Sequence, residues 1–173
     1  LPAIKAQEST FNMGDKVVNL GIGLGSSYYR GLYYSMGVPP LSISYEQAVA
    51  DEILENGVIG IGGYLGYSSY RYRYDAGTYT WGWNYSNIIL GGIGTFHYPL
   101  VDKLDTYAGI LLGYRITLVS EFGDVGTNTS SASSGIAYSG FIGARYYFRE
   151  KMSAFAQLGY GIAYLTIGIS FKL

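Results

Sequence analysis

The chain offers few side chains that could carry out catalysis or hold a metal. It has no cysteine and a single histidine, His97, so cysteine nucleophiles and thiolate or multi-histidine zinc sites are excluded. Ser86 is the serine nearest to His97 in the sequence, and a Ser–His pair is one way to build a hydrolase. A lone histidine beside a predicted turn is more often structural. We therefore expect no enzymatic activity, no metal and no cofactor.

Three charged residues fall within strongly apolar segments: Glu46, Arg115 and Arg145. Each lies on the side of its segment that carries small residues, opposite the apolar side. Because a buried charge must be paired or solvated, we expect Glu46 to contact Arg145 or Arg115. Such a network would plug the interior of the fold. The alternative is that the same groups line a narrow gated pore.

The segments that hold these charges alternate with a period of two, which predicts β-strands. From Val18, apolar Val18, Leu20, Ile22 and Leu24 oppose Asn19, Gly21, Gly23 and Gly25. The same alternation recurs in these segments: 41–46, 59–67, 108–117, 136–146, 154–160 and 165–171. The segment 81–98 is also strand-like, but the consecutive Ile88, Ile89 and Leu90 obscure its phase, and a bulge there would explain them. We count eight strands.

The polarity of the two strand faces indicates the environment in which the chain folds. Charged residues make up only 13% of the chain, and one face of each strand is almost purely apolar. The opposite face of Gly, Ser and Thr buries too little apolar area to form a core. The apolar face must then contact lipid, and strands in lipid must close into a barrel. The uncharged stretch 152–171 could instead be read as a membrane helix, but its glycines and its period of two favour strands.

The connections between the predicted strands alternate in kind. Short charged connections occupy 51–57, 99–105 and 149–151, and longer ones rich in Tyr, Gly, Ser and Asn occupy 28–38, 72–80 and 120–134. A very short one near Gly161 is the exception. Bacterial outer-membrane barrels place short turns in the periplasm and longer loops outside. Residues 1–15 form an N-terminal extension, either the remnant of a signal peptide or the start of the mature chain.

One predicted hairpin, residues 69–85, is a candidate interaction surface. It combines arginines with aromatic residues: Arg71, Tyr72, Arg73, Tyr74, Tyr79, Trp81 and Trp83. Arg71 and Arg73 share the face that is apolar lower down, so they belong at or above the outer membrane surface. Tyr, Trp and Arg are enriched at binding hot spots. The alternative is an interfacial girdle without a partner.

The last segment carries the resemblance to a known family. Residues 166–173 resemble the β-signal of outer-membrane proteins at Gly168 and Phe171, with Leu173 in place of the terminal aromatic residue. With eight strands, residues 16–173 resemble the small OmpA/OmpX-type barrels of the Gram-negative envelope. The resemblance implies an all-β protein, an eight-stranded antiparallel up-and-down transmembrane β-barrel, in the bacterial outer membrane, with the insertion machinery as a partner.

The function expected from these features is a structural or interaction role, such as an accessory subunit of a larger outer-membrane complex. A small gated pore is the alternative, and an outer-membrane enzyme comes third. Expected partners are membrane lipid, lipopolysaccharide and other outer-membrane proteins. Nucleic acid is excluded because the net charge is −1 and no basic stripe is present.

Overall fold

The computed structural model describes residues 10–26, 33–77, 79–123 and 130–173. These contain eight β-strands: β1 (Lys16–Leu24), β2 (Tyr34–Ile53), β3 (Gly57–Ala76), β4 (Tyr79–Val101), β5 (Leu104–Gly123), β6 (Ser130–Arg149), β7 (Met152–Tyr160) and β8 (Leu165–Lys172). In the described part of the chain, no helix is long and apolar enough to cross a membrane.

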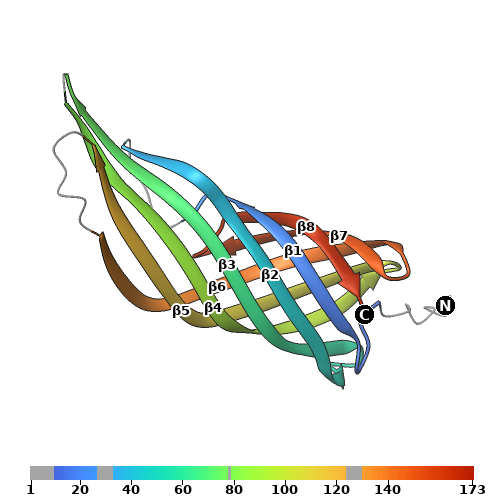
Figure 1. The fold of residues 1–173 in the computed structure, drawn as a ribbon. Coiled ribbons are helices and arrows are strands. Elements are labelled where there is room, and N and C mark those ends of the chain that lie inside the picture. Colours follow the sequence, from blue (N-terminus) through green and yellow to red (C-terminus); the bar gives the residue numbers. More distant parts are fainter. Residues whose placement is uncertain (1–9, 27–32, 78, 124–129) are drawn as a thin grey trace.

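The strands form one closed barrel in which each strand pairs with the next and β1 pairs with β8 (Figure 1). All pairs are antiparallel, which gives the up-and-down order expected from the sequence. Following paired residues once around the barrel from Tyr146 returns to β6 at Ile136, a stagger of ten residues. A barrel of this size tilts its strands by roughly 40°.

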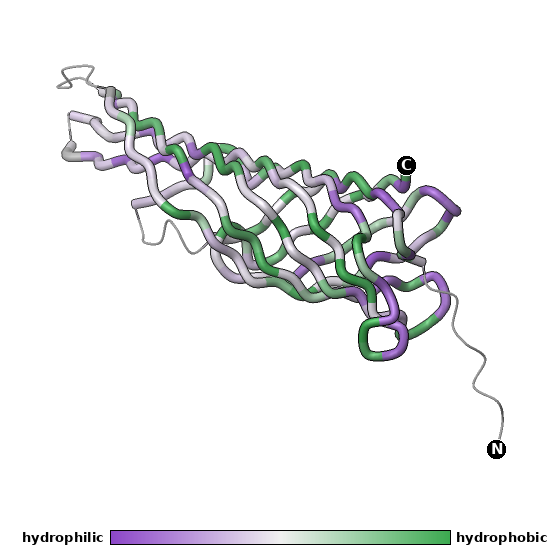
Figure 2. The backbone as a smooth tube through the Cα atoms, turned by 90° about the horizontal axis from the view of Figure 1, so that it is seen from below, coloured by the Kyte–Doolittle hydropathy of each residue, from purple (hydrophilic) through white to green (hydrophobic). Residues whose placement is uncertain are grey.

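The side chains alternate between lipid-facing and lumen-facing positions as the sequence predicted. Ile110, Leu112 and Ile136 are 66–70% exposed on the outside, and Figure 2 shows apolar residues recurring along the barrel wall. A closed barrel with an apolar outside and a polar inside is a transmembrane β-barrel. In β4, Ile88 and Leu90 face outward and Ile89 fills the lumen, without a register shift around them. The bulge considered for this segment is therefore absent.

The strands are of two lengths, and this makes the barrel wall uneven. β1, β7 and β8 have 9, 9 and 8 residues, whereas β2 to β6 have 20 to 23. About 9–11 residues already cross a membrane, so the long strands continue beyond it. We call their outer parts, residues 34–40, 68–76, 79–87, 117–123 and 130–133, the protruding sheet. It forms the extended upper end of the molecule in Figure 1.

The protruding sheet corrects the expected loop lengths. Residues 72–80, predicted as a long loop, belong mostly to strands, because β3 runs to Ala76 and β4 begins at Tyr79. The predicted loop 28–38 is shortened by β2, which begins at Tyr34. The predicted loop 120–134 is shortened by both β5 and β6. The alternation of apolar and polar residues did not reveal these strand extensions, because strand residues above the lipid do not need an apolar face.

The N-terminal segment contributes to the barrel rather than only preceding it. Phe11 is 1% exposed and packs with Val17, Ala48 and Val58 at the end of the short turns. The Gly14 N–H donates to the Ala48 carbonyl at 3.1 Å, and the Lys172 ammonium lies 2.6 Å from the Asp15 carboxylate. The described residues 10–15 of the N-terminal extension therefore pack against this end of the barrel.

Candidate functional site

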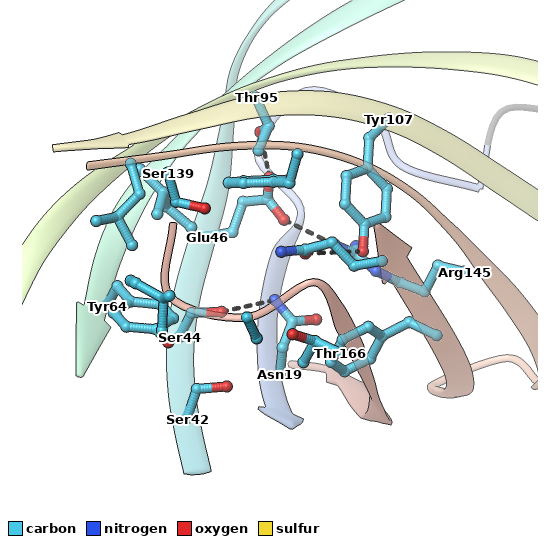
Figure 3. Close-up of a pocket in the computed structure, with 17 residues that line it drawn as sticks. Asn19, Ser42, Ser44, Glu46, Tyr64, Thr95, Tyr107, Ser139, Arg145 and Thr166 are labelled. Atoms are coloured by element: carbon cyan, nitrogen blue, oxygen red, sulfur yellow. Dashed lines mark hydrogen bonds and ion pairs between the residues drawn. The ribbon is translucent and has the colours of Figure 1, made fainter. Parts of the chain in front are cut away.

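A buried ion network lies inside the barrel near the short turns, with Glu46 of β2 at its centre (Figure 3). Glu46 Oε2 is 2.8 Å from Arg145 Nη2 of β6, across the lumen. Arg145 Nη1 lies 3.2 Å from Asp105 Oδ2 of β5. All three residues are 1–3% exposed. Each is placed by strand parity alone, because alternate residues of every strand face the lumen. The contact expected between Glu46 and Arg145 is present.

His97 of β4 completes the network. Its Nδ1 is 2.8 Å from Asp105 Oδ1, and its Nε2 is 2.8 Å from Glu46 Oε1. Thr95, two residues earlier on the same face, donates its hydroxyl hydrogen bond to Glu46. Sequence reasoning missed His97 and Asp105, because the phase of β4 was unclear and Asp105 was assigned to a turn. Asp105 instead pairs in register with Arg145, a signal that strand pairing could have supplied.

Aromatic rings cover the network on two sides. The Phe11 ring centroid is 4.3 Å from that of His97, and the Arg145 guanidinium carbon lies 5.1 Å from the Tyr107 centroid. Burial by Phe11 and Tyr107 shields the ions from water, so their mutual attraction acts at a low effective dielectric constant.

The Thr95–His97–Asp105 arrangement has the spacing of a catalytic triad, since Thr95 Oγ1 is 3.0 Å from His97 Nε2. The same hydroxyl is committed to Glu46, and Thr95 and His97 are only 6% and 1% exposed. The Ser86–His97 pair considered from the sequence does not form. Ser86 lies eleven residues away on β4 and faces the opposite side of the strand, because its register partner Leu118 is lipid-facing.

Arg115 takes the predicted lumen-facing position but lies far from Glu46. It pairs in register with Ile89 and Gly135, ten residues along β5 from Asp105, or roughly 30 Å of strand. Between Arg115 and the ion network, Ile89, Leu111, Ala137 and Ile162 form an apolar cluster across the lumen. Figure 3 shows a cavity that borders both this cluster, at Leu111 and Ile162, and the ion network, at Glu46 and Arg145. Its lining also includes the polar residues Asn19, Ser42, Ser44, Ser139 and Thr166.

The second candidate site is an aromatic ladder on the inner face of the protruding sheet. Register pairs place Tyr72 beside Trp83 and Tyr74 beside Trp81, all on the lumen-facing side of β3 and β4. The two tryptophan rings meet edge to face at 4.3 Å, and the Tyr72 and Trp83 centroids are 5.7 Å apart. From β2, Tyr34 meets Tyr72 at 5.1 Å. The rings therefore support one another as a fixed surface.

The arginines of the same hairpin lie on its outer face. Arg71 Nε donates to Asn84 Oδ1 at 2.8 Å, and its guanidinium lies 5.2 Å from the Phe122 ring centroid. Arg73 Nε is 3.1 Å from Asp75 Oδ1. The seven predicted residues thus share one hairpin but divide between two faces, with Tyr79 58% exposed at the tip.

Gly168 and Phe171 lie in β8, and Leu173 follows it. A side chain at Gly168 would meet the Leu20 carbonyl oxygen and the Phe155 ring. Close strand packing alone therefore requires glycine at this position. The role of Gly168, Phe171 and Leu173 as an insertion signal stays a prediction.

Comparison with known proteins found no matching family model and no matching curated protein. Among solved structures, the chain is similar to Ail, the attachment invasion locus protein of Yersinia pestis, with 10% identity, a TM-score of 0.47 and coverage of 93% of this chain and 96% of Ail. It is also similar to the N-terminal β-barrel domain of Pseudomonas aeruginosa OprF, with 14% identity, a TM-score of 0.47 and coverage of 93% and 98%. The assignment as an eight-stranded transmembrane barrel rests on the strand pairing and side-chain orientation of the chain itself.

Proposed function

We propose that this protein is an interaction barrel of the bacterial outer membrane, in which the lumen is a structural plug and the protruding sheet binds another envelope protein. The observation that carries the proposal is the aromatic ladder. Tyr74 is 42% exposed and Tyr33, which meets its ring at 6.2 Å, is 56% exposed. Large rigid rings above the lipid, flanked by arginines, match the composition of binding hot spots. A barrel that served only as an anchor has no need of them.

The filled lumen supports an interaction role over the alternative of a small gated pore. Ions would have to pass the apolar cluster around Ile89 and Leu111 and then the network of Glu46, His97, Asp105 and Arg145. Opening such a path means separating ion pairs that are 1–3% exposed. Breaking a buried ion pair costs about 3–5 kcal/mol.

The test is a variant in which Tyr72, Tyr74 and Arg73 are replaced by Ser. We expect copurification of the envelope partner with the tagged barrel to fall at least tenfold, since a tenfold loss corresponds to about 1.4 kcal/mol and truncation of a single hot-spot residue costs about 2 kcal/mol or more. Leu100→Ser with Asp102→Ser, on the exposed turn at the other end of the barrel, is the matched control and should copurify the partner like the wild type. Binding to lipopolysaccharide micelles is measured in parallel.

The outcomes distinguish between a protein and a lipid as the binding partner of the aromatic ladder. Loss of the protein partner alone supports the proposal. Loss of micelle binding alone would assign the ladder to the sugars of surface lipid. If copurification and micelle binding both survive, the rings only stiffen the protruding sheet and the proposal fails.

A further inference from the structure

A pocket of about 470 Å³ opens at the short-turn end of the barrel, away from the protruding sheet. It lies between the β4–β5 turn, the β6–β7 turn, the end of β8 and the N-terminal segment. Among the described residues, its lining contains the cations Lys103, Arg149 and Lys172 and one carboxylate, that of Glu150. The pocket therefore has an excess of positive charge and favours an anion.

Two of the three cations have no ion-pair partner. The Lys172 ammonium is committed, because it lies 2.6 Å from the Asp15 carboxylate and donates to the Thr10 carbonyl at 3.2 Å. Lys103 and Arg149 form no ion pair with any described residue, and both are exposed. The buried Thr10 hydroxyl, from the same lining, has no hydrogen-bond partner in the part of the chain that the structure describes. A bound anion would supply the acceptors that these three groups lack.

The aromatic residues beside the pocket place it at the membrane surface. Phe148, next to Arg149 and also part of the lining, is 50% exposed, and Tyr146 on the same outer face is 53% exposed. Aromatic rings concentrate where the hydrocarbon meets the lipid headgroups, and Figure 2 shows hydrophilic residues in the turns just beyond. The pocket therefore lies at the level of the headgroups, where the abundant anion is the phosphate of a phospholipid.

An apolar groove of about 510 Å³ lies on the lipid-facing wall above the pocket. Small residues form its floor, among them Thr106, Ala144 and Ala156, and larger side chains such as Tyr98 and Leu158 border it. The Thr106 hydroxyl donates to the Tyr98 carbonyl, so it needs no partner from the lipid. The groove is therefore suited to a hydrocarbon chain, which forms no hydrogen bonds.

The pocket and the groove follow one another along β5 and β6. The Tyr147 N–H donates to the Lys103 carbonyl at 2.9 Å, and Thr106 pairs with Ala144 further up the same two strands. Lys103 and Thr106 are three residues apart, or roughly 10 Å of strand. The headgroup and the upper acyl chain of one phospholipid span such a distance, so a single lipid can occupy both.

We propose that this end of the barrel binds one anionic phospholipid, with its phosphate beside Lys103 and Arg149 and an acyl chain over Ala144 and Ala156. Short turns face the periplasm in outer-membrane barrels, so the lipid belongs to the periplasmic leaflet in the expected orientation. Lys103 and Arg149 outnumber the Glu150 carboxylate, which favours an anionic headgroup over one that also carries an ammonium. The inference goes beyond the proposed function, because the site lies at the opposite end from the aromatic ladder.

The test uses the full chain in detergent, titrated with phosphatidylglycerol, and native mass spectrometry to count the lipids that stay bound. We expect one phosphatidylglycerol per barrel. Phosphatidylcholine, which has the same chains and a zwitterionic headgroup, should be retained at least tenfold more weakly. Inorganic phosphate at the concentration of the lipid should not displace it, because free phosphate makes no contact with the groove.

Charge variants separate the pocket from the general charge of the rim. Lys103→Ser with Arg149→Ser should weaken retention of phosphatidylglycerol at least tenfold. Lys16→Ser with Lys151→Ser removes the same charge from exposed lysines that do not line the pocket, and it should retain the lipid like the wild type. Lys103→Arg with Arg149→Lys keeps both charges and should also bind normally.

A pair of groove variants tests the position of the acyl chain. Ala156→Phe fills the floor of the groove and should weaken retention at least fivefold. Ala154→Phe lies on the same face of β7 outside the groove lining, and it should have no effect. Both changes place an aromatic ring in lipid, so both barrels should fold, and heat-modifiable gel mobility checks every variant.

The proposal is overturned if no phosphatidylglycerol stays bound, or if phosphatidylcholine is retained equally well. Equal losses in the two serine pairs would assign the effect to the charge of the rim. Displacement by inorganic phosphate would make the occupant a free anion, and normal retention by Ala156→Phe would show that no chain lies in the groove. None of these results bears on the Tyr72, Tyr74 and Arg73 copurification assay, so the two proposals fail independently.

Discussion

Glu46 is held by side chains from two other strands, Arg145 of β6 and the pair Thr95 and His97 of β4. Its carboxylate therefore ties together strands that are not neighbours in the barrel. A charge in this position would be costly without those partners. With them it fixes the width and register of the barrel near the short turns.

We predict that Glu46→Gln lowers the thermal unfolding midpoint more than Glu52→Gln does. The amide cannot balance the charge of Arg145, and loss of one partner of a buried ion pair costs about 3–5 kcal/mol. Glu52 is an exposed residue near the β2–β3 turn and serves as the control. The measurement is the temperature at which the folded gel band disappears. Equal shifts for the two variants would show that the network contributes nothing to stability.

Half of this network could be predicted from the sequence. Glu46 and Arg145 stand on clear alternating segments, so parity and the cost of a lone buried charge led directly to their contact. His97 could not be placed because Ile88, Ile89 and Leu90 are all apolar, and only the closed structure shows that Ile89 fills the lumen. Asp105 was assigned to a turn because a charge next to Asp102 and Lys103 looks solvent-exposed.

Among the elements, the β3–β4 hairpin ends in a small polar cluster around Asp75. The Thr80 hydroxyl donates to Asp75 at 2.8 Å, and together with the nearby Arg73 it lowers the pKa of the Asp75 carboxyl from its ordinary value. The charged carboxylate is thus the form that the hairpin tip favours. The carboxylate orders the hairpin tip at pH values above the ordinary pKa of aspartate. This effect is lost as the pH falls through the lowered pKa of Asp75.

We predict that the tip of the hairpin loosens below about pH 4, where an ordinary aspartate becomes protonated. The Trp81 indole NMR signal, close to this tip, should change over that range and stay constant from pH 5 to pH 7. Asp75→Asn should remove the change while leaving the neutral-pH spectrum nearly unaltered. A pH response that persists in Asp75→Asn would assign the effect to another group.

The sequence predicted the positions of the strands better than their lengths. Alternation located the strands because each has a lipid-facing side, but it did not reveal that β3 and β4 continue to Ala76 and Tyr79. Above the lipid both faces of a strand meet water or each other, so Tyr, Gly and Ser there look like loop residues. Alternation also separated Tyr72 and Tyr74 from the arginines, but the side on which Trp81 and Trp83 lie needed the register, because the phase of 81–98 was unclear.

For the molecule as a whole, we predict the behaviour of a membrane barrel. The protein should require detergent, give a circular dichroism spectrum dominated by β-structure, and migrate faster on gels before boiling than after. The physical reason is the closed backbone pairing, which detergent does not open and heat does. A stable monomer in detergent-free buffer would contradict the assignment of the outer face to lipid.

The uneven wall has a consequence for the lipid around it. On the side of β1, β7 and β8, strands of 8 or 9 residues tilted by roughly 40° rise only about 20–25 Å, close to the lower limit for a bilayer. On the opposite side, the longer strands are all long enough to cross the bilayer. Mismatch of this kind is relieved by thinning the bilayer or by leaning of the barrel. The molecule should therefore thin the membrane on one side only. Neighbouring proteins that prefer a thin bilayer will then collect beside β7 and β8, so the barrel has a preferred orientation relative to them in the plane of the membrane.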